Sequence, residues 1–308
     1  YDVYAQRVNP AGVVQWATDG VVVTAASGNQ TSLYVMGDGF RGTIIAWQDN
    51  RSGSNDIYAQ RVNSAGVAQW TADGVAICTA SGSQTAPTMT GDGVGGAIIT
   101  WTDYRSNNYD VYAQRINSAG IIQWTANGVP ICTASGQQSD RRVYSDGAGG
   151  AIIAWQDYRS GNSDIYAQRI NPAGEVQWTV DGIPVSTASG NQTSLWLAGD
   201  GSGGAIITWR DNRSGDWDIY AQRLYGNGSL SPTPYAWPGD PKVNVPIIMA
   251  SGSQEEARII SNGRGGAIII WSDNRSGNYD MYAQRISAVG EVQWPTDGVA
   301  ITTAAGDQ

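Results

Sequence analysis

The sequence predicts an all-β protein, a β-propeller made of four-stranded antiparallel blades. The first observation is a segment of the form W-x-D-x-R-S-x-x-x-D-[IVM]-Y-A-Q-R, found at 47–61, 101–115, 155–169, 209–223 and 271–285. The second is the spacing of its final arginine, 54 residues four times and then 62, at Arg7, Arg61, Arg115, Arg169, Arg223 and Arg285. The third is the composition, in which 40 glycines and a single lysine suit tight turns and not long helices. Units of this size must stack on one another to bury their faces.

One unit, residues 84–135, shows how each blade is built. Its strands are expected at 88–90, 97–101, 110–116 and 123–132. The second of these, Ala97-Ile-Ile-Thr-Trp101, is apolar throughout, so we expect it to be buried on both faces. A Gly-Asp-Gly turn precedes it and a polar loop comes after it. Four short antiparallel strands in each repeat make one propeller blade.

The repeat also sets the domain organisation, which we take as one propeller domain over residues 1–308. Complete blades are expected at 28–81, 82–135, 136–189, 190–251 and 252–305, with the outer half of a further blade at 1–27. A six-bladed ring is favoured, in which sequence beyond Gln308 supplies the missing inner strands. Two alternatives stay open: a five-bladed ring with a spare hairpin, and strands donated by a neighbouring chain. Because the sequence begins at Tyr1 inside a strand pattern, without an initiator Met, we expect a processed or excised piece of a longer protein.

Charge and composition exclude several classes of protein. A net charge of −9 and a pI of about 4.4 argue against nucleic-acid binding, which needs a basic surface. No apolar run approaches the length of a membrane span, so no membrane insertion is expected. Cys78 and Cys132 lie at equivalent positions of neighbouring repeats, which predicts two unbridged, buried thiols. A catalytic thiol is not expected, because the chain has no histidine to activate one.

The repeat resembles those of secreted bacterial sialidase-like propellers, the Asp-box or BNR type. The resemblance rests on W-x-D-x-R-x-G-x-x-D-I-Y, succeeded by a turn and a tryptophan. In that family the turn reads S-x-D-x-G-x-T-W, whereas residues 63–70 keep Gly66 and Trp70 and lack the aspartate. The copies at 9–16, 117–124 and 171–178 depart in the same way. The resemblance covers nearly the whole chain and implies a fold, not a reaction.

The family's enzymes use an arginine triad, a tyrosine nucleophile with a glutamate, and an acid aspartate. That set cannot be placed on this sequence, and no F/Y-R-I-P-like motif occurs near its start. The resemblance therefore implies a propeller that is extracellular or on the surface of a bacterial cell, without assigning catalytic residues.

Charges that recur in every complete blade are expected to be structural. The aspartate of each W-x-D-x-R segment would accept hydrogen bonds from the adjoining loop and pair with its arginine. The residues of a single active site should differ from the repeated pattern and should not recur in every blade. These structural residues are Asp49, Arg51, Asp103, Arg105, Asp157, Arg159, Asp211, Arg213, Asp273 and Arg275. By the same reasoning Arg115 and its copies are expected between blades, beside a carboxylate or a carbonyl.

The first strand of each blade is expected to line the central channel, and its copies differ from one another. Mixed charge gathers at Asp140, Arg141 and Arg142 and again at Glu255, Glu256 and Arg258. Two arginines could clamp a carboxylate, and an acidic pair could act on a glycoside. The candidate catalytic residues are Arg141, Arg142, Glu255 and Arg258, and the candidate ligand-binding residues are Asp140, Tyr144, Trp196 and Tyr34. The alternative is a solvated channel mouth whose charges pair with one another.

The second departure is a longer turn at 225–242, rich in proline, whose aromatics we expect to be exposed. It is a candidate docking loop for a partner, with Tyr235, Trp237 and Lys242 as contacts. The alternative is a tolerated surface insertion. No metal site is expected, because an arginine lies inside the oxygen-rich loop 274–280 and calcium-loop spacing is absent. No cofactor is expected, since no phosphate loop or redox motif occurs.

These observations lead to one main hypothesis and two alternatives. The main hypothesis is a non-catalytic secreted or cell-surface propeller that serves as a binding or assembly module, for a glycan or a cell-surface protein. The first alternative is a sialidase-like glycoside hydrolase that uses the channel charges. The second is a structural subunit that self-associates by completing its incomplete blade in trans.

Overall fold

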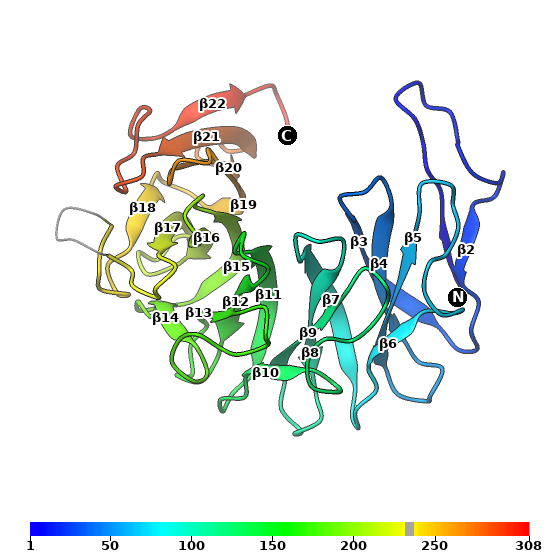
Figure 1. Cartoon of the computed structure of the whole chain (residues 1–308). Helices are drawn as coiled ribbons and strands as arrows, with labels where there is room; N and C mark the ends of the chain where they lie inside the picture. Colours follow the sequence, from blue (N-terminus) through cyan, green and yellow to red (C-terminus); the bar gives the residue numbers. More distant parts are fainter. Residues whose placement is uncertain (232–236, 308) are drawn as a thin grey trace. The chain divides into compact units, whose positions relative to one another are not determined.

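The computed structural model describes residues 1–231 and 237–307, and their regular elements are 22 β-strands (Figure 1). None of these residues forms a helix that is long and apolar enough to cross a membrane. The chain divides into two compact units. The first unit comprises Tyr1–Thr133 with Ala148–Ala151 and Asn171–Glu175, and the second comprises Ala134–Gly147, Ile152–Ile170 and Val176–Gln308.

The first unit contains one two-stranded and two four-stranded antiparallel sheets. The small sheet pairs β1 (Val3–Ala5) with β2 (Val21–Thr24). The next sheet consists of β3 (Gln30–Gly37), β4 (Thr43–Asp49), β5 (Asp56–Val62) and β6 (Val75–Cys78). The third consists of β7 (Gln84–Gly91), β8 (Ala97–Asp103), β9 (Asp110–Ile116) and β10 (Val129–Cys132).

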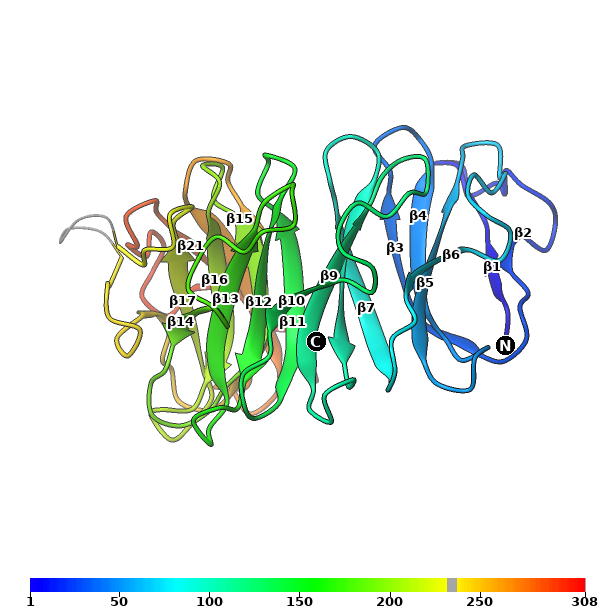
Figure 2. The same cartoon turned by 60° about the horizontal axis from the view of Figure 1, so that its bottom comes forward.

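The second unit carries three more sheets of the same kind, each with its strands in sequence order. Figure 2 labels strands from all three. The first consists of β11 (Gln138–Ser145), β12 (Ala151–Asp157), β13 (Asp164–Ile170) and β14 (Ile183–Ser186). The second consists of β15 (Gln192–Gly199), β16 (Ala205–Asp211), β17 (Asp218–Leu224) and β18 (Val245–Ile248). The third consists of β19 (Gln254–Ser261), β20 (Ala267–Asp273), β21 (Asp280–Ile286) and β22 (Val299–Thr302). Five four-stranded propeller blades and half of another are therefore present, as the repeat predicts.

Within a blade, the second and third strands pair residue for residue and form the core. In β8 and β9 the register runs from Ala97 opposite Ile116 to Asp103 opposite Asp110. The Trp101 ring is fully buried and stacks on Tyr112, with 6.4 Å between the ring centroids. The apolar run that predicted a doubly covered strand therefore packs as expected.

The fourth strand is shorter than the sequence predicts. In the blade of β7–β10 it begins at Val129, whereas we expected it from residue 123. The reason is local, because the backbone N–H of Trp124 donates to the side-chain oxygen of Gln114 in β9 at 3.0 Å and not to a backbone carbonyl of that strand.

Four of the five first strands contain a β-bulge near their start. The register shifts there in the pairs β3–β4, β7–β8, β15–β16 and β19–β20. The third residue of the strand has a positive φ in every complete blade, at Ser32 (51°), Ala86 (49°), Asp140 (38°), Ser194 (54°) and Glu256 (52°). Such a conformation is unfavourable for residues with a Cβ, and a bulge of this kind redirects the side chains that come after it.

The long turn at 225–242 corrects one expectation. Trp237 was predicted to be an exposed docking residue, but it is 1% exposed and its indole N–H donates to the carbonyl of Ala288 at 3.0 Å. In the four preceding repeats a tryptophan makes this contact, as Trp70 does with Ser118 at 3.1 Å. Lys242 is exposed. Tyr235 lies outside the described residues.

Candidate functional site

The repeated Asp and Arg residues hold the loop between the second and third strands. Asp103 is fully buried and accepts hydrogen bonds from the indole of Trp101 at 2.8 Å and from the backbone N–H of Arg105 at 2.9 Å. The guanidinium of Arg105 pairs with the same carboxylate at 2.6 Å and stacks over the ring of Tyr112 at 3.9 Å. The other four blades form the same ion pair. These carboxylates therefore bind groups of their own strand and loop.

The arginines of the Y-A-Q-R segments tie one blade to the next. Arg61 pairs with Asp38 of its own blade at 2.7 Å and donates to the carbonyl of Ser118, in the next blade, at 3.1 Å. Arg115 pairs with Asp92 at 3.0 Å, which is the carboxylate partner predicted for it. These arginines hold the blades together, so the search for a binding site turns to the residues that depart from the repeat.

Those departures meet at one position of the first strands in the second unit. Arg142 in β11, Trp196 in β15 and Arg258 in β19 are each the fifth residue of their strand, and these strands lie next to one another (Figure 1). The guanidinium carbons of Arg142 and Arg258 lie 4.8 and 4.4 Å from the centroid of the Trp196 indole. We call Arg142, Trp196 and Arg258 the Arg–Trp–Arg row. The row lies two residues beyond the positive-φ residues of these strands, Asp140, Ser194 and Glu256.

The two arginines of the row differ in their charge partners. Arg142 pairs with Asp140 at 2.7 Å, and both side chains are partly exposed. Arg258 donates to the backbone carbonyls of Glu256 and Ala257 at 3.2 and 3.1 Å. Among the described residues Arg258 forms no ion pair, and it is solvent-exposed. The row therefore presents one guanidinium whose charge is not neutralised.

Glu255 belongs to a second cluster, which the sequence reasoning missed. It pairs with Arg210 at 2.9 Å, and Arg210 lies over the ring of Trp217 at 4.5 Å. Arg210 occupies the variable position of W-x-D, where the other blades have Gln48, Thr102, Gln156 and Ser272. That break in the repeat was a usable signal. Glu255 and Glu256 also line a hollow of about 270 Å³ with Ser272, Tyr279 and Asp307.

Three other candidates lie away from the row. Arg141, a candidate catalytic residue, is 3% exposed, so its side chain is not available to a ligand. Burial and the adjacent charge of Arg142 lower the pKa of Arg141 to about 9, although Asp140 opposes the shift. The ring of Tyr144 lies against Gly199 and remains partly exposed. Tyr34 occupies the same strand position as the row, but it lies in the first unit.

The thiols offer no further reactive group. Cys78 and Cys132 are buried and unbridged, as predicted. Burial raises the pKa of Cys78 to about 11, so this thiol stays protonated at neutral pH and is a poor nucleophile. Among the described residues, no group of three Cys, Asp or Glu side chains is arranged to hold a metal ion.

Neither a protein-family model nor a curated protein matches this chain. Among solved structures it is similar to an endo-arabinase from Bacteroides thetaiotaomicron, at 13% identity over 94% of this chain and 100% of that one, with a TM-score of 0.44. It is also similar to the GH93 α-L-arabinofuranosidase of Fusarium graminearum, at 10% identity over 90% and 82%, with a TM-score of 0.48. A thermostable family-43 glycoside hydrolase matches at 10% identity over 93% and 99%, with a TM-score of 0.43. Structural similarities with such low sequence identities and TM-scores assign neither a reaction nor a ligand to this chain.

Proposed function

We propose that this chain is a non-catalytic binding module that takes an anionic saccharide at the Arg–Trp–Arg row. The observation that carries the proposal is that two guanidinium groups lie within 5 Å of one indole, at matching positions of three neighbouring blades. Stacking on the indole orients both guanidinium groups before a ligand arrives, which reduces the entropy lost on binding.

The charge of the row selects the ligand. Although the chain carries a net charge of −9, the exposed guanidinium of Arg258 has no ion-pair partner among the described residues and leaves the row locally positive. A guanidinium binds carboxylate and sulfate groups through two parallel hydrogen bonds. The partly exposed indole of Trp196 adds apolar surface of the kind that covers one face of a sugar ring. Uronic-acid and sulfated saccharides combine these two features.

A glycoside hydrolase is the second candidate, favoured by one observation. Glu256 precedes Arg258 by two residues, is exposed, and forms no ion pair among the described residues. Hydrolysis requires a second carboxylate, and Asp140 beside the row and Glu255 are held in ion pairs with Arg142 and Arg210. Asp307, which lines the hollow with Glu256, accepts a hydrogen bond from the backbone N–H of Tyr279 at 3.0 Å. Binding without turnover is therefore the better interpretation.

Titration calorimetry tests the proposal with oligogalacturonate and heparin fragments as carboxylate and sulfate probes, and maltohexaose as a neutral control. We expect binding of an anionic probe that weakens as salt is added, and no binding of maltohexaose. Arg258→Ala and Trp196→Ala should each weaken binding about tenfold or more, since a hydrogen bond to a charged group contributes about 1.5–3 kcal/mol. Arg264→Ala, an exposed arginine in a turn of the same blade as Arg258, is the matched control.

Two results decide between the candidates. Equal binding by wild type and Arg258→Ala, or no binding of either anionic probe, would remove the proposed site. Release of reducing sugar by wild type that is lost in Glu256→Gln would establish the hydrolase instead.

A further inference from the structure

The two-stranded sheet leaves one edge of β1 open. In complete blades the third strand has seven residues and pairs on both sides, as β5 does with β4 and β6. In β1 only Val3–Ala5 are in strand conformation, and among the described residues they pair only with β2. The open edge faces the position that a second strand occupies in every other blade.

Arg7 makes half of the contacts that its copies make. Four copies bind a carboxylate from the turn between the first and second strands of their own blade, in the pairs Arg61–Asp38, Arg115–Asp92, Arg169–Asp146 and Arg223–Asp200 at 2.7–3.0 Å. Arg7 keeps the other contact, donating to the carbonyl of Ser64 at 3.1 Å as Arg61 does to Ser118. Among the described residues Arg7 meets no carboxylate, and its side chain is exposed.

Apolar residues around this edge are exposed where their copies are buried. Val8 is 57% exposed, whereas Val62, Ile116, Ile170, Leu224 and Ile286 are fully buried. On the facing strand β3, Leu33 and Val35 are 54% and 65% exposed, whereas their copies in β15, Leu195 and Leu197, are 0% and 8% exposed. The sequence is as apolar here as in the other blades, so the exposure reflects a missing neighbour.

A tryptophan is missing from the same place. In three complete blades the tryptophan of the second strand stacks on the tyrosine of the third, as Trp47 does on Tyr58 at 6.4 Å. It also lies against a turn glycine, as Trp47 does against Gly74. In the small sheet the corresponding Tyr4 is 55% exposed, and no tryptophan is among the nearest neighbours of a Cβ built on Gly20.

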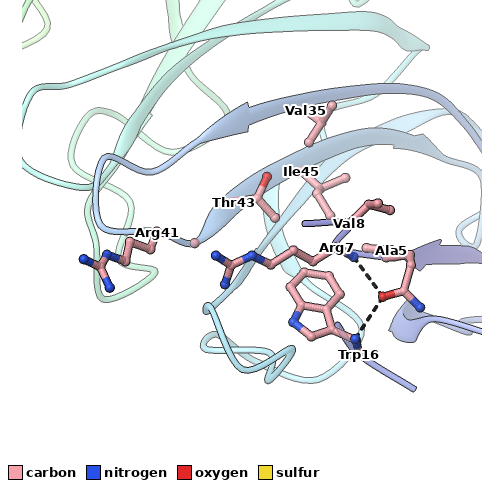
Figure 3. Close-up of a pocket in the computed structure, with 10 residues that line it drawn as sticks. Ala5, Arg7, Val8, Trp16, Val35, Arg41, Thr43 and Ile45 are labelled. Carbon is pink, nitrogen blue, oxygen red and sulfur yellow. Dashed lines mark hydrogen bonds between the residues drawn. The ribbon is translucent and has the colours of Figure 1, made fainter. Parts of the chain in front are cut away.

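A second arginine adds charge to this edge. Arg41 occupies a turn position that is glycine in the other blades, Gly95, Gly149, Gly203 and Gly265, and it keeps their positive φ, at 68°. With Arg7, Trp16 and Val35 it lines a hollow of about 350 Å³. Figure 3 shows the guanidinium groups of Arg7 and Arg41 extending toward the same side of this hollow. An L-residue in this strained conformation is unfavourable, so a bulky arginine here is a departure that calls for a function.

We propose that the open edge of β1 is a docking site for a β-hairpin of the inner-strand type. Strand pairing along β1 would place an aspartate of the hairpin turn at Arg7 and a tryptophan of its second strand on Tyr4. Arg41 would meet the turn itself, since a Cβ built on its copy Gly149 lies 3.6 Å from the backbone oxygen of the preceding turn residue Asp92. Arg41 therefore favours a partner turn with a further acceptor.

A second copy of this chain does not fit the site. Each first and second strand that the structure describes is already paired within its own blade. A copy would have to open a blade to offer a hairpin, at the cost of a buried core. The occupant is therefore a hairpin from outside residues 1–308 that carries Asp and Trp at the repeat spacing.

The experiment uses a synthetic peptide with the sequence of residues 84–103, which contains Asp92 and Trp101. Calorimetry with the full chain should show binding at a ratio of one to one. Arg7→Ala in the chain and Asp92→Asn in the peptide should each weaken binding about tenfold, and the two together should cost little more than one alone. Arg285→Ala, the exposed copy of Arg7 in the last blade, should leave binding unchanged.

A second experiment uses a grafted chain, which tests the proposal even if the isolated peptide does not fold. Residues 84–108 placed before Tyr1 recreate the repeat's own connection, because Tyr1-Asp2 corresponds to Tyr109-Asp110. We expect the amides of β1 to exchange about tenfold more slowly in the graft than in wild type, and Arg7→Ala to reverse part of this protection. Unchanged exchange in the graft overturns the proposal. So does a dimer of the unmodified chain, seen by light scattering, whose β1 amides are already protected.

Discussion

The indole N–H of Trp101 donates to Oδ2 of Asp103 at 2.8 Å, two residues further along the same strand. The same carboxylate holds the backbone and the guanidinium of Arg105, so three donor groups converge on one buried anion. A buried carboxylate is tolerated only when such partners replace water. The Asp–Arg pair recurs in five blades, which explains why a conspicuous set of repeated charges is not a binding surface.

Removing one of these carboxylates should destabilise the chain strongly. Asp103→Ala leaves the indole N–H of Trp101 and the guanidinium of Arg105 without their common acceptor, and breaking a buried pair costs about 3–5 kcal/mol. Urea denaturation should show a lower midpoint. Asp216→Ala, an exposed aspartate of the equivalent loop, should stay within about 0.5 kcal/mol of wild type. Similar midpoints for the two variants would contradict the assigned role.

Two buried aspartates of the same loop type should respond to pH with opposite signs. Burial by itself would raise the pKa of Asp49, but hydrogen bonds from Arg51 and Trp47 outweigh it and lower the pKa. Asp49 therefore contributes stability above its unfolded pKa of about 3.9, and this contribution is lost as the pH falls through the folded pKa. Burial raises the pKa of Asp218 despite a hydrogen bond from Ser214. The charged form of Asp218 therefore destabilises the fold at neutral pH, and protonation removes this destabilisation as the pH falls.

Thermal denaturation of two variants checks these signs. Asp49→Asn should lower the Tm at pH 7, and the difference from wild type should narrow below about pH 4. Asp218→Asn should raise the Tm at pH 7 and lose its advantage at acid pH. Differences of the same sign for both variants at pH 7 would show that the pKa of Asp218 is not raised.

The repeat predicted the contacts that equivalent residues share and failed where a contact depends on a local shift. The Asp103–Arg105 pair and the carboxylate beside Arg115 were predicted, because each recurs at fixed spacing. Trp237 was misjudged because an insertion after Tyr225 displaces it from the repeat spacing, although its indole still reaches the turn of the next blade. The Arg–Trp–Arg row was only partly foreseen, since the bulges that place its side chains side by side leave no signature in the sequence.

A pair of equivalent glycines separates packing from backbone strain. Gly120 and Gly12 occupy the same turn position, with φ of 80° and 76°. A Cβ on Gly120 would lie 2.6 Å from the ring of Trp70, whereas a Cβ on Gly12 would meet nothing within 4 Å. Both alanine variants incur the strain of a positive φ, about 1–2 kcal/mol. Gly120→Ala should cost about 1–3 kcal/mol more, through overpacking, in urea denaturation. Equal losses would mean that Trp70 does not pack on this turn.

Trp237 should behave as a core residue although it lies in the most divergent segment of the chain. It is 1% exposed, packs in the cluster around Ile269 and Trp271, and lies 3.1 Å from a Cβ built on Gly290. Trp237→Ala should destabilise the chain by about 3–5 kcal/mol, because it leaves a large cavity and removes a hydrogen bond to the carbonyl of Ala288. Lys242→Ala, in the same turn but exposed, should have little effect. A Trp237→Ala variant with the same urea midpoint as wild type would contradict the core role and favour the predicted role of a surface docking residue.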